Sequence, residues 1–394
     1  MKAIAITGLG IVSSVASDIN AFLRAIRDVR TPNFTKSIRI DLDIDIIVAE
    51  AADSCFTEPK NRLFDNPTSR LLLTAARECF NDFLQSGGQK PDALIVGTST
   101  GGQKVCEDFV FSYMSGQNDI SLNYRAQGTM ASPTRLIASE LEIEGRVNTV
   151  STACTSSANA IALGCSMIDS GRASAVLTGG GDALCATTMS GFHILGLTGH
   201  KPCRPFGPNR PGMTLGDGAA FLMLEPLENV LADARPYYAE IMSYGYSSDA
   251  FSMTSPSENG EGAYNAMKSA LIKAHIEPEL VDYINAHGTG TIHNDRSEAL
   301  AIQHLFGDKK VSSLKGLLGH TLAGAGAIEA VASVLAVREM MAWENFNSYE
   351  CDKDCPVNLV PEGGFEFKEN PLVLSNSFAF GGNNCSLLFG RPKR

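Results

Sequence analysis

The chain has 394 residues, of which 44% are hydrophobic and 19% charged, and its formal net charge is -11. This acidic balance argues against a partner such as nucleic acid or an anionic membrane surface. Gly8 and Gly10 interrupt the apolar N-terminus, and no stretch reaches the run of about 18 apolar residues that spans a bilayer. We therefore expect a soluble cytoplasmic protein without membrane insertion, long enough for two domains.

Short β-branched segments, glycine-rich turns and alanine-rich helical segments alternate along the chain. Buried strands that end in glycine turns are predicted within residues 3–8, 90–102, 173–184 and 281–291. Amphipathic or small-residue helices are predicted within residues 69–88, 155–171 and 260–279. This alternation favours an α/β fold with largely buried sheets.

A weak internal repeat indicates two similar halves that face each other. Each half contains a strand with a Gly/Thr turn, followed by a strand that leads into a small-residue helix, at 94–102 and 147–163 and again at 283–291 and 311–331. We place the halves at residues 1–235 and 236–394. Residues 30–56 and 115–130 follow no clean period and are predicted to be loops and covering segments.

Ten cysteines are spread along the chain, which is not the arrangement of a disulfide framework. Cys351 and Cys355 are close together, but a zinc site needs a second pair of cysteine or histidine ligands, and none lies nearby in the sequence. We interpret these two residues as free thiols of a surface loop in a reducing cytosol, and we expect no metal site.

Cys154 is the first residue that could carry chemistry. It lies in VSTACTSSANAIALGCSMIDSG, residues 150–171, where a buried strand gives way to a helix. Unpaired backbone N–H groups and the helix dipole at such a position stabilise a thiolate, so the sequence predicts a lowered pKa for this thiol. Small neighbouring residues leave room for a substrate.

A second polar segment is NAHGTGT, residues 285–291, which places His287 at the end of a strand. The glycines and the hydroxyls of Thr289 and Thr291 beside it indicate a polar ligand that passes close to the backbone. Asp295 and Glu298 begin the following helix and are interpreted as helix caps or structural carboxylates rather than acid–base catalysts.

Two further junctions complete the pattern. Lys315 and His320 lie in KGLLGH, just before a helix rich in alanine and glycine. Phe378 lies in NSFAFGG, residues 376–382, between two strands. If the halves face each other, Cys154, His287, Lys315 and His320 converge on one site.

With these motifs in this order, the chain resembles the β-ketoacyl-acyl carrier protein synthases, condensing enzymes of the thiolase-like superfamily. The resemblance rests on STACTSS, NAHGTGT, KGLLGH, TLGDGAAFLMLE and NSFAFGG, and it covers nearly the whole chain. Two histidines after the cysteine are typical of the elongating Cys-His-His type. The resemblance implies a thiolase-like fold, with the two halves in a layered α/β/α/β/α architecture, and acyltransferase activity.

The family's catalytic roles carry over to four matching positions. Cys154 would be the nucleophile that takes an acyl chain from the phosphopantetheine thioester of a carrier protein. His287 and His320 would bind the malonyl thioester carbonyl and stabilise the enolate as carbon dioxide leaves, and Lys315 would tune or position this pair. The reaction implied is a decarboxylative Claisen condensation with malonyl-carrier protein.

The resemblance also assigns supporting roles. Thr289 and Thr291 would bind the pantetheine arm, and the backbone N–H groups of Cys154 and Phe378 would form an oxyanion hole. Phe378 would also gate the acyl pocket. Glu298 and Glu329 match acidic positions that are structural in the family, and Asp295 is expected to be a third structural acidic residue near the site. No metal or organic cofactor is expected, because the thioester carries the activation.

Partners follow from the same resemblance: an acyl carrier protein, and a second subunit in either a homodimer or a heterodimer with a chain-length factor. Chain-length factors themselves lack the cysteine, so this chain would be the active member. The acidic carrier would dock on a basic patch, for which Arg125, Arg204 and Arg210 are candidates by loop position.

A thiolase, which needs a second catalytic cysteine, and a non-catalytic protein of the same fold are the competing hypotheses. Ser151 stands three residues before the nucleophile, where the family commonly has an acidic residue or alanine. Residues 30–57 and 106–131 also depart from the family pattern. These departures favour a polyketide or aryl polyene pathway over general fatty-acid synthesis.

Overall fold

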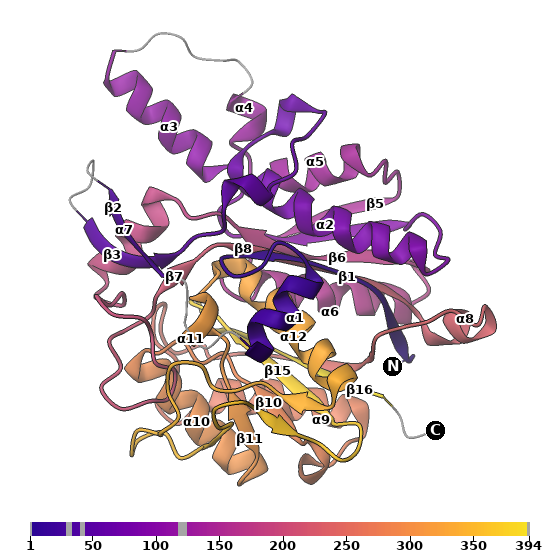
Figure 1. Cartoon of the computed structure of the whole chain (residues 1–394), viewed down its shortest axis with the longest axis vertical. Coiled ribbons are helices and arrows are strands. Elements are labelled where there is room, and N and C mark those ends of the chain that lie inside the picture. The colour runs from indigo at the N-terminus through magenta and orange to yellow at the C-terminus, as the bar shows by residue number, and fades with distance from the viewer. Residues whose placement is uncertain (1, 29–33, 40–43, 117–123, 392–394) are drawn as a thin grey trace.

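The computed structural model describes residues 2–28, 34–39, 44–116 and 124–391 of the chain (Figure 1). Within these residues the strands form one 11-stranded sheet and two small sheets of three and two strands. The large sheet has two parts, one from each half of the sequence, which are joined where β1 pairs with β9 at Ile4 and Ala5.

The first part of the sheet comes from the N-terminal half, in the order β1-β8-β6-β4-β5. The pairs β1–β8 and β8–β6 are antiparallel, whereas β6–β4 and β4–β5 are parallel. The strands are β1 Ile4–Ser13, β4 Ala93–Gly97, β5 Arg146–Val150, β6 Val176–Asp182 and β8 Gly218–Pro226.

The second part repeats this pattern in the order β9-β16-β15-β10-β11, with β13 added at the edge. Here β9–β16 and β16–β15 are antiparallel, and β15–β10 and β10–β11 are parallel. The strands are β9 Glu240–Ser248, β10 Tyr283–Asn285, β11 Lys310–Ser312, β13 Asn358–Leu359, β15 Val373–Phe378 and β16 Asn383–Gly390. The matching orders show that the two halves share one topology, as the internal repeat predicts.

Helices cover and separate the two parts of the sheet (Figure 1). Helices α2 (Pro67–Gln85) and α5 (Ser132–Glu140) pack on the outer face of the first part. Helix α9 (Glu261–Ala274) packs on the outer face of the second, and α10 (Ile292–Phe306) packs on α9. Helices α6 (Ser156–Asp169) and α12 (Ala325–Glu339) lie between the two parts of the large sheet, which completes the α/β/α/β/α order.

The central position of α12 follows from its composition. Every residue from Ala325 to Val337 is buried, and the helix is apolar on all sides apart from Glu329 and Ser333. A helix without a polar face is stable only when it is covered on every side. Small side chains let α6 approach closely, and a Cβ atom added at Gly326 would lie 2.8 Å from the Cβ of Ala158.

Shorter elements complete the fold. The helices are α1 Ile19–Asp28, α3 Gln103–Met114, α4 Tyr124–Gln127, α7 Ala186–Ile194, α8 Leu227–Ala232 and α11 Lys315–Leu318. The strands are β2 Thr35–Arg39, β3 Ile44–Ala49, β7 Leu215–Gly216, β12 Met341–Ala342 and β14 Phe365–Glu366. The segments predicted as strands and helices in the sequence overlap β1, β4, β6, β10, α2, α6 and α9. The first strand does not end at Gly8 as predicted, because β1 continues to Ser13.

The prediction of loops at residues 30–56 is wrong for β2 and β3. These strands pair with each other, and β3 also pairs in parallel with β7. The partner of β3, Leu215–Gly216, lies far along the chain, so no local period shows it. In the segment 115–130, α4 replaces part of the predicted loop, and residues 117–123 lie outside the described ones.

None of the described helices combines the length and the apolar character that crossing a bilayer requires.

The contact between α6 and α12 predicts that Gly326→Ala destabilises the protein. The new methyl group would meet Ala158 and Ser377 at distances under 3.0 Å, so the two helices must move apart. We expect a loss of about 1–3 kcal/mol in the free energy of unfolding, measured by chemical denaturation. Gly191, also within a helix, has open space around it, so Gly191→Ala should leave stability unchanged or slightly raised. Equal stability of the two variants would contradict this account.

Candidate active site

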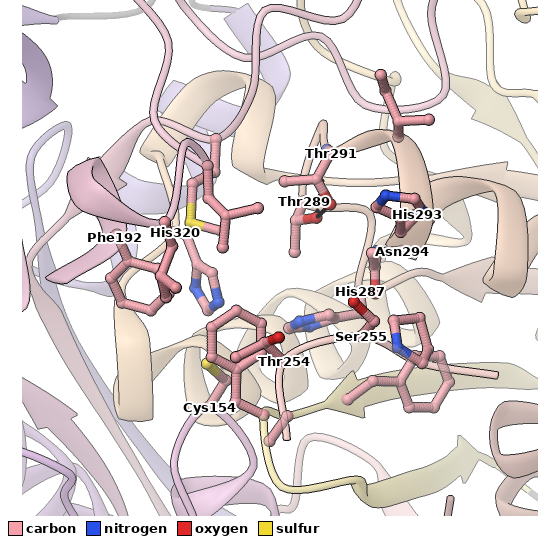
Figure 2. A pocket seen from close by; sticks show the side chains of 18 of the residues that line it. Cys154, Phe192, Thr254, Ser255, His287, Thr289, Thr291, His293, Asn294 and His320 are labelled. Carbon is pink, nitrogen blue, oxygen red and sulfur yellow. Dashed lines mark hydrogen bonds between the residues drawn. The ribbon is translucent and has the colours of Figure 1, made fainter. Parts of the chain in front are cut away.

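A cavity of about 430 Å³ opens where the two halves meet (Figure 2). Its wall includes Cys154, His287, Phe378 and His320. Cys154 and His287 follow strands β5 and β10, Phe378 ends β15, and His320 follows the short helix α11 after β11. Strand ends of the two halves therefore converge at one site, as the sequence predicts.

Cys154 lies in a sharp turn between β5 and α6. The residue before it, Ala153, has a φ angle of 52°, which is a left-handed backbone conformation that residues other than glycine rarely adopt. The hydroxyl of Ser156 holds this turn, because it accepts from the Thr152 N–H at 2.9 Å and donates to the Ala153 carbonyl at 2.6 Å. Strained turns persist when their surroundings fix them, and this one directs the thiol into the cavity (Figure 2).

The pKa predicted for Cys154 is wrong in direction. Burial raises the pKa of this thiol to about 12, and the positive charge of Lys315 only partly opposes that effect. The side chain is 7% exposed, so removing water from the thiolate outweighs the effect of the helix N-terminus on which the sequence prediction rests. The side chain of Cys154 is therefore a neutral thiol near pH 7.

Lys315 and Glu329 form a buried ion pair next to His287. The Nζ atom of Lys315 also donates to the backbone carbonyl of His287 and lies 3.3 Å from Nδ1 of the His287 ring. An ammonium group can only donate, so Nδ1 of His287 is the acceptor and its proton lies on Nε2. Burial, then Lys315 and His320, hold the pKa of His287 well below its usual range, so the ring is neutral.

His320 has the same tautomer for a different reason. The backbone N–H of Leu322 donates to its Nδ1 at 3.2 Å, which leaves the proton on Nε2. Burial and the charge of Lys315 lower the pKa of His320 as well. The rings of His287 and His320 stand edge to face with their centroids 5.2 Å apart. The site thus contains two neutral imidazoles, each with an N–H donor at Nε2.

Two carboxylates organise the backbone around His287. Glu298 accepts from the N–H groups of His287 and Gly288 at 2.9 and 2.8 Å, and burial raises its pKa to about 7. Asp295 accepts from the N–H groups of Phe206 and Gly290 at 2.8 and 3.1 Å. Glu329 is also buried and binds Lys315, so all three predicted acidic residues lie near the site and hold backbone or lysine groups.

Thr289 and Thr291 line the cavity, and their hydroxyls lie 2.8 Å apart. Phe378 ends β15 and contacts His287 edge to face, with ring centroids 5.9 Å apart. Sequence reasoning missed the apolar wall that Phe192 forms together with Phe380, whose rings are 5.5 Å apart. Helix α7 brings Phe192 to the cavity, and neither its spacing nor its neighbours in the sequence indicate this.

Several predictions about surface groups need correction. Cys351 is exposed, but Cys355 is fully buried, and its sulfur accepts from Arg210 at 2.6 Å. Arg210 is only 4% exposed and also lies near Asp295, so it is occupied inside the protein rather than free for docking. Arg204 is half-buried and Arg125 is exposed.

A thiolase would need a second cysteine at the site. Cys385 is the cysteine closest to the NSFAFGG motif in the sequence, but it is fully buried within β16, where it is paired with Ser377. It is not part of the cavity wall. Among the residues that line the cavity, Cys154 is the one thiol, and the histidines that line it are His287, His293 and His320.

Two family models match the chain, and together they account for most of it. The family described as "Beta-ketoacyl synthase, N-terminal domain" matches residues 1–229, and "Beta-ketoacyl synthase, C-terminal domain" matches residues 238–348. The chain belongs to the beta-ketoacyl synthase family. The division predicted at residue 235 remains a prediction.

Individual relatives agree with this family. The 3-oxoacyl-[acyl-carrier-protein] synthase 2 of Rhizobium meliloti is 33% identical over 355 residues, which are 85% of this chain and 83% of that protein. A chain of the ishigamide ketosynthase/chain length factor is 29% identical, with a TM-score of 0.92 over 100% of both chains. A structure of a ketosynthase in complex with its chain length factor, from Xenorhabdus doucetiae, is 31% identical, with a TM-score of 0.88 over 99% of this chain and 98% of that one.

These comparisons confirm the family, the thiolase-like fold and the class of condensing acyltransferase that the motifs predicted. They also account for the topology, because the matches to solved ketosynthases cover both halves of the chain.

The raised pKa of Cys154 predicts how the thiol responds to pH. Because its pKa is about 12, the thiolate fraction should rise about tenfold for each pH unit between pH 7 and 9.5. We expect the rate of alkylation by iodoacetamide at Cys154, followed by peptide mass analysis, to rise with that slope. A plateau above pH 8 would contradict the pKa. The exposed Cys351 provides an internal comparison in the same sample.

Proposed function

We propose that this member of the family elongates an acyl chain by decarboxylative Claisen condensation, with Cys154 as nucleophile and malonyl-acyl carrier protein as donor of two carbons. The observation that carries the proposal is the cavity that contains Cys154 together with two neutral imidazoles. Such a set can accept an acyl group and stabilise an enolate, which are the two requirements of this reaction.

The first half-reaction loads the enzyme. The sulfur of Cys154 attacks the carbonyl carbon of an acyl thioester on the carrier, and the bond between that carbon and the pantetheine sulfur breaks. The pantetheine leaves as a thiol with the proton that the cysteine gives up. We propose the backbone N–H groups of Cys154 and Phe378 as donors to the oxyanion that forms in between, because both residues lie at the cavity.

The second half-reaction forms the carbon–carbon bond. The malonyl thioester loses carbon dioxide, and the electron pair of the broken bond becomes an enolate on the carrier-bound group. We propose that the Nε2–H groups of His287 and His320 donate to the enolate oxygen. The enolate carbon then attacks the acyl group on Cys154, whose sulfur leaves and takes up a proton, and β-ketoacyl-carrier protein is released.

Lys315 supports this step without touching the substrate, because it lies behind His287 and pairs with Glu329. Burial, and after it the charge of Lys315, lowers the pKa of both imidazoles and keeps them neutral, which makes them donors that do not protonate the enolate carbon. We propose that Thr289 and Thr291 bind the pantetheine arm, since their hydroxyls line the cavity. Phe378 is proposed as the gate of the acyl pocket. The proposed reaction needs no metal or organic cofactor.

We further propose an acyl carrier protein and a second subunit as partners. The edge strand β5, which leads to Cys154, is mostly exposed, whereas the other edge of the large sheet is the short β13. An exposed edge strand presents unpaired N–H and C=O groups that can pair with another chain.

The partner is either a second copy or a chain-length factor, as in the solved Xenorhabdus doucetiae complex. With the complete set of site residues, this chain is the active member of either pair. A cytoplasmic location is part of the same proposal.

Loading of Cys154 can be tested by intact mass. Incubation with a panel of aliphatic and aryl acyl-carrier thioesters should add one acyl group to the unaltered protein and none to Cys154→Ala. Cys351→Ala, which removes an exposed thiol away from the cavity, should load normally. The preferred acyl group distinguishes general fatty-acid synthesis from a polyketide or aryl polyene pathway. Loading of the Cys154→Ala variant at the native rate would refute the nucleophile.

His320→Ala should separate the two half-reactions. Loss of one donor to the enolate oxygen is expected to lower the rate of condensation by about 100- to 1000-fold. Loading of Cys154 should change far less, because the thioester carbonyl has other donors. Product formation and single-turnover loading, measured side by side, give the ratio of the condensation rate to the loading rate. The exposed His200, which lies outside the cavity wall, provides the matched control His200→Ala. Equal losses in both half-reactions would contradict the role of His320.

A further inference from the structure

Asp182 is a fully buried carboxylate that none of the motifs identified. It is the last residue of β6, and its side chain is 0% exposed. Its oxygens accept from a dense set of backbone and hydroxyl donors: Thr98 Oγ1, Ser99 N and Oγ, Thr100 N and Oγ1, and Ala323 N. A buried charge needs such compensation, and this one is surrounded by donors on both sides.

The bond to Ala323 joins the two halves of the molecule. The Ala323 N–H donates to Asp182 at 3.1 Å across 141 residues of sequence. Ala323 follows Leu322, whose own N–H donates to Nδ1 of His320. Leu322 has a φ angle of 54°, which is unfavourable for a leucine, so the turn after His320 must be held in place by its contacts.

The remaining bonds of Asp182 reach toward the cysteine. They hold the turn 98–100, and the Thr98 N–H donates to the carbonyl of Val150 at 3.0 Å. Val150 ends β5, the strand that leads into the turn with Cys154. One carboxylate thus connects the segment before the nucleophile with the segment after His320.

We propose that Asp182 is a positioning residue: by anchoring Ala323 it fixes the strained turn that places the Leu322 N–H on Nδ1 of His320. The ring is then held with its Nε2 proton available to the cavity. The consequence for catalysis rests on the proposed function, because it assumes that His320 donates to the enolate oxygen. The consequence for the tautomer does not depend on any substrate.

A carboxylate suits this role better than an amide. All the groups that face Asp182 in these contacts are donors, so an asparagine would point its NH₂ group at one set of them. Either the turn 98–100 or Ala323 would then lose its acceptor. Asp182→Asn keeps the size of the side chain, removes its negative charge and replaces one acceptor oxygen with an NH₂ donor.

The test compares Asp182→Asn with Asp92→Asn. Asp92 also links separate segments through backbone N–H groups, those of Ser174 and Ala175, but it lies at the opposite end of the sheet, just before β4. We expect Asp182→Asn to lower kcat for condensation about 10- to 100-fold, with loading of Cys154 and KM for the malonyl donor within about threefold. Asp92→Asn should leave the ratio of the half-reactions unchanged. If Asp182→Asn also leaves the ratio of the condensation rate to the loading rate unchanged, the proposal is overturned.

Nitrogen NMR on protein labelled with ¹⁵N-histidine reads the tautomer directly, with His320→Ala to assign the signal. The unaltered protein should show His320 with its proton on Nε2, and Asp182→Asn should show loss of that single state. A His320 signal that is the same in both proteins would refute the positioning role. If all carrier substrates fail with the unaltered protein, the proposed function fails, yet this spectrum still decides the role of Asp182.

A measurement on the unaltered protein covers the case in which Asp182→Asn does not fold. The amide protons of Leu322 and Ala323 should exchange with deuterated solvent only slowly, because both are buried and hydrogen-bonded. Exchange as fast as that of an exposed loop would show that the turn is not anchored, and the proposal would be wrong.

Discussion

The close contact of α6 with α12 is the constraint on which the site depends. Gly326 and Ala158 let the two helices touch almost backbone to backbone, and the Ala327 N–H donates to Ser157 at 2.9 Å. This contact fixes the distance between the two parts of the large sheet. Because each helix begins just after a chemically important residue, the same contact brings the cysteine of one half to the histidines of the other. Wider side chains at this contact would separate the reacting groups.

Burial then sets the chemistry of the groups that converge. Taking the imidazoles and the thiol out of water favours their neutral forms, and the ammonium of Lys315 adds to this effect for the histidines. A site of this kind offers hydrogen-bond donors without strong acids or bases. That is suited to a reaction in which decarboxylation, rather than proton abstraction, generates the carbanion, since a charged imidazolium would protonate it.

The hydrogen bonds that orient the site come from a wider range of the chain than the reacting groups themselves. Ser156 holds the turn of Cys154 locally, whereas Glu298 holds the backbone at His287 from the following helix. Asp182 reaches the turn after His320 from the other half of the molecule. Carboxylates that accept from backbone N–H groups thus take the place of regular secondary structure at the points where strands end, and they keep irregular turns rigid.

The sequence by itself determined the family and the order of the main elements, because these are written in short motifs and local periods. From the same motifs it predicted the cysteine, the histidine pair and the lysine as the residues of the site. It could not determine the protonation of Cys154, since burial is a property of the whole fold. The rise in the thiol pKa that burial causes outweighed the lowering expected from the N-terminus of the helix. Nor could it show the β3–β7 pairing, the burial of Cys355 or the bond from Asp182 to Ala323. Each of these depends on contacts between distant segments, and only the tertiary structure decides which distant segments meet.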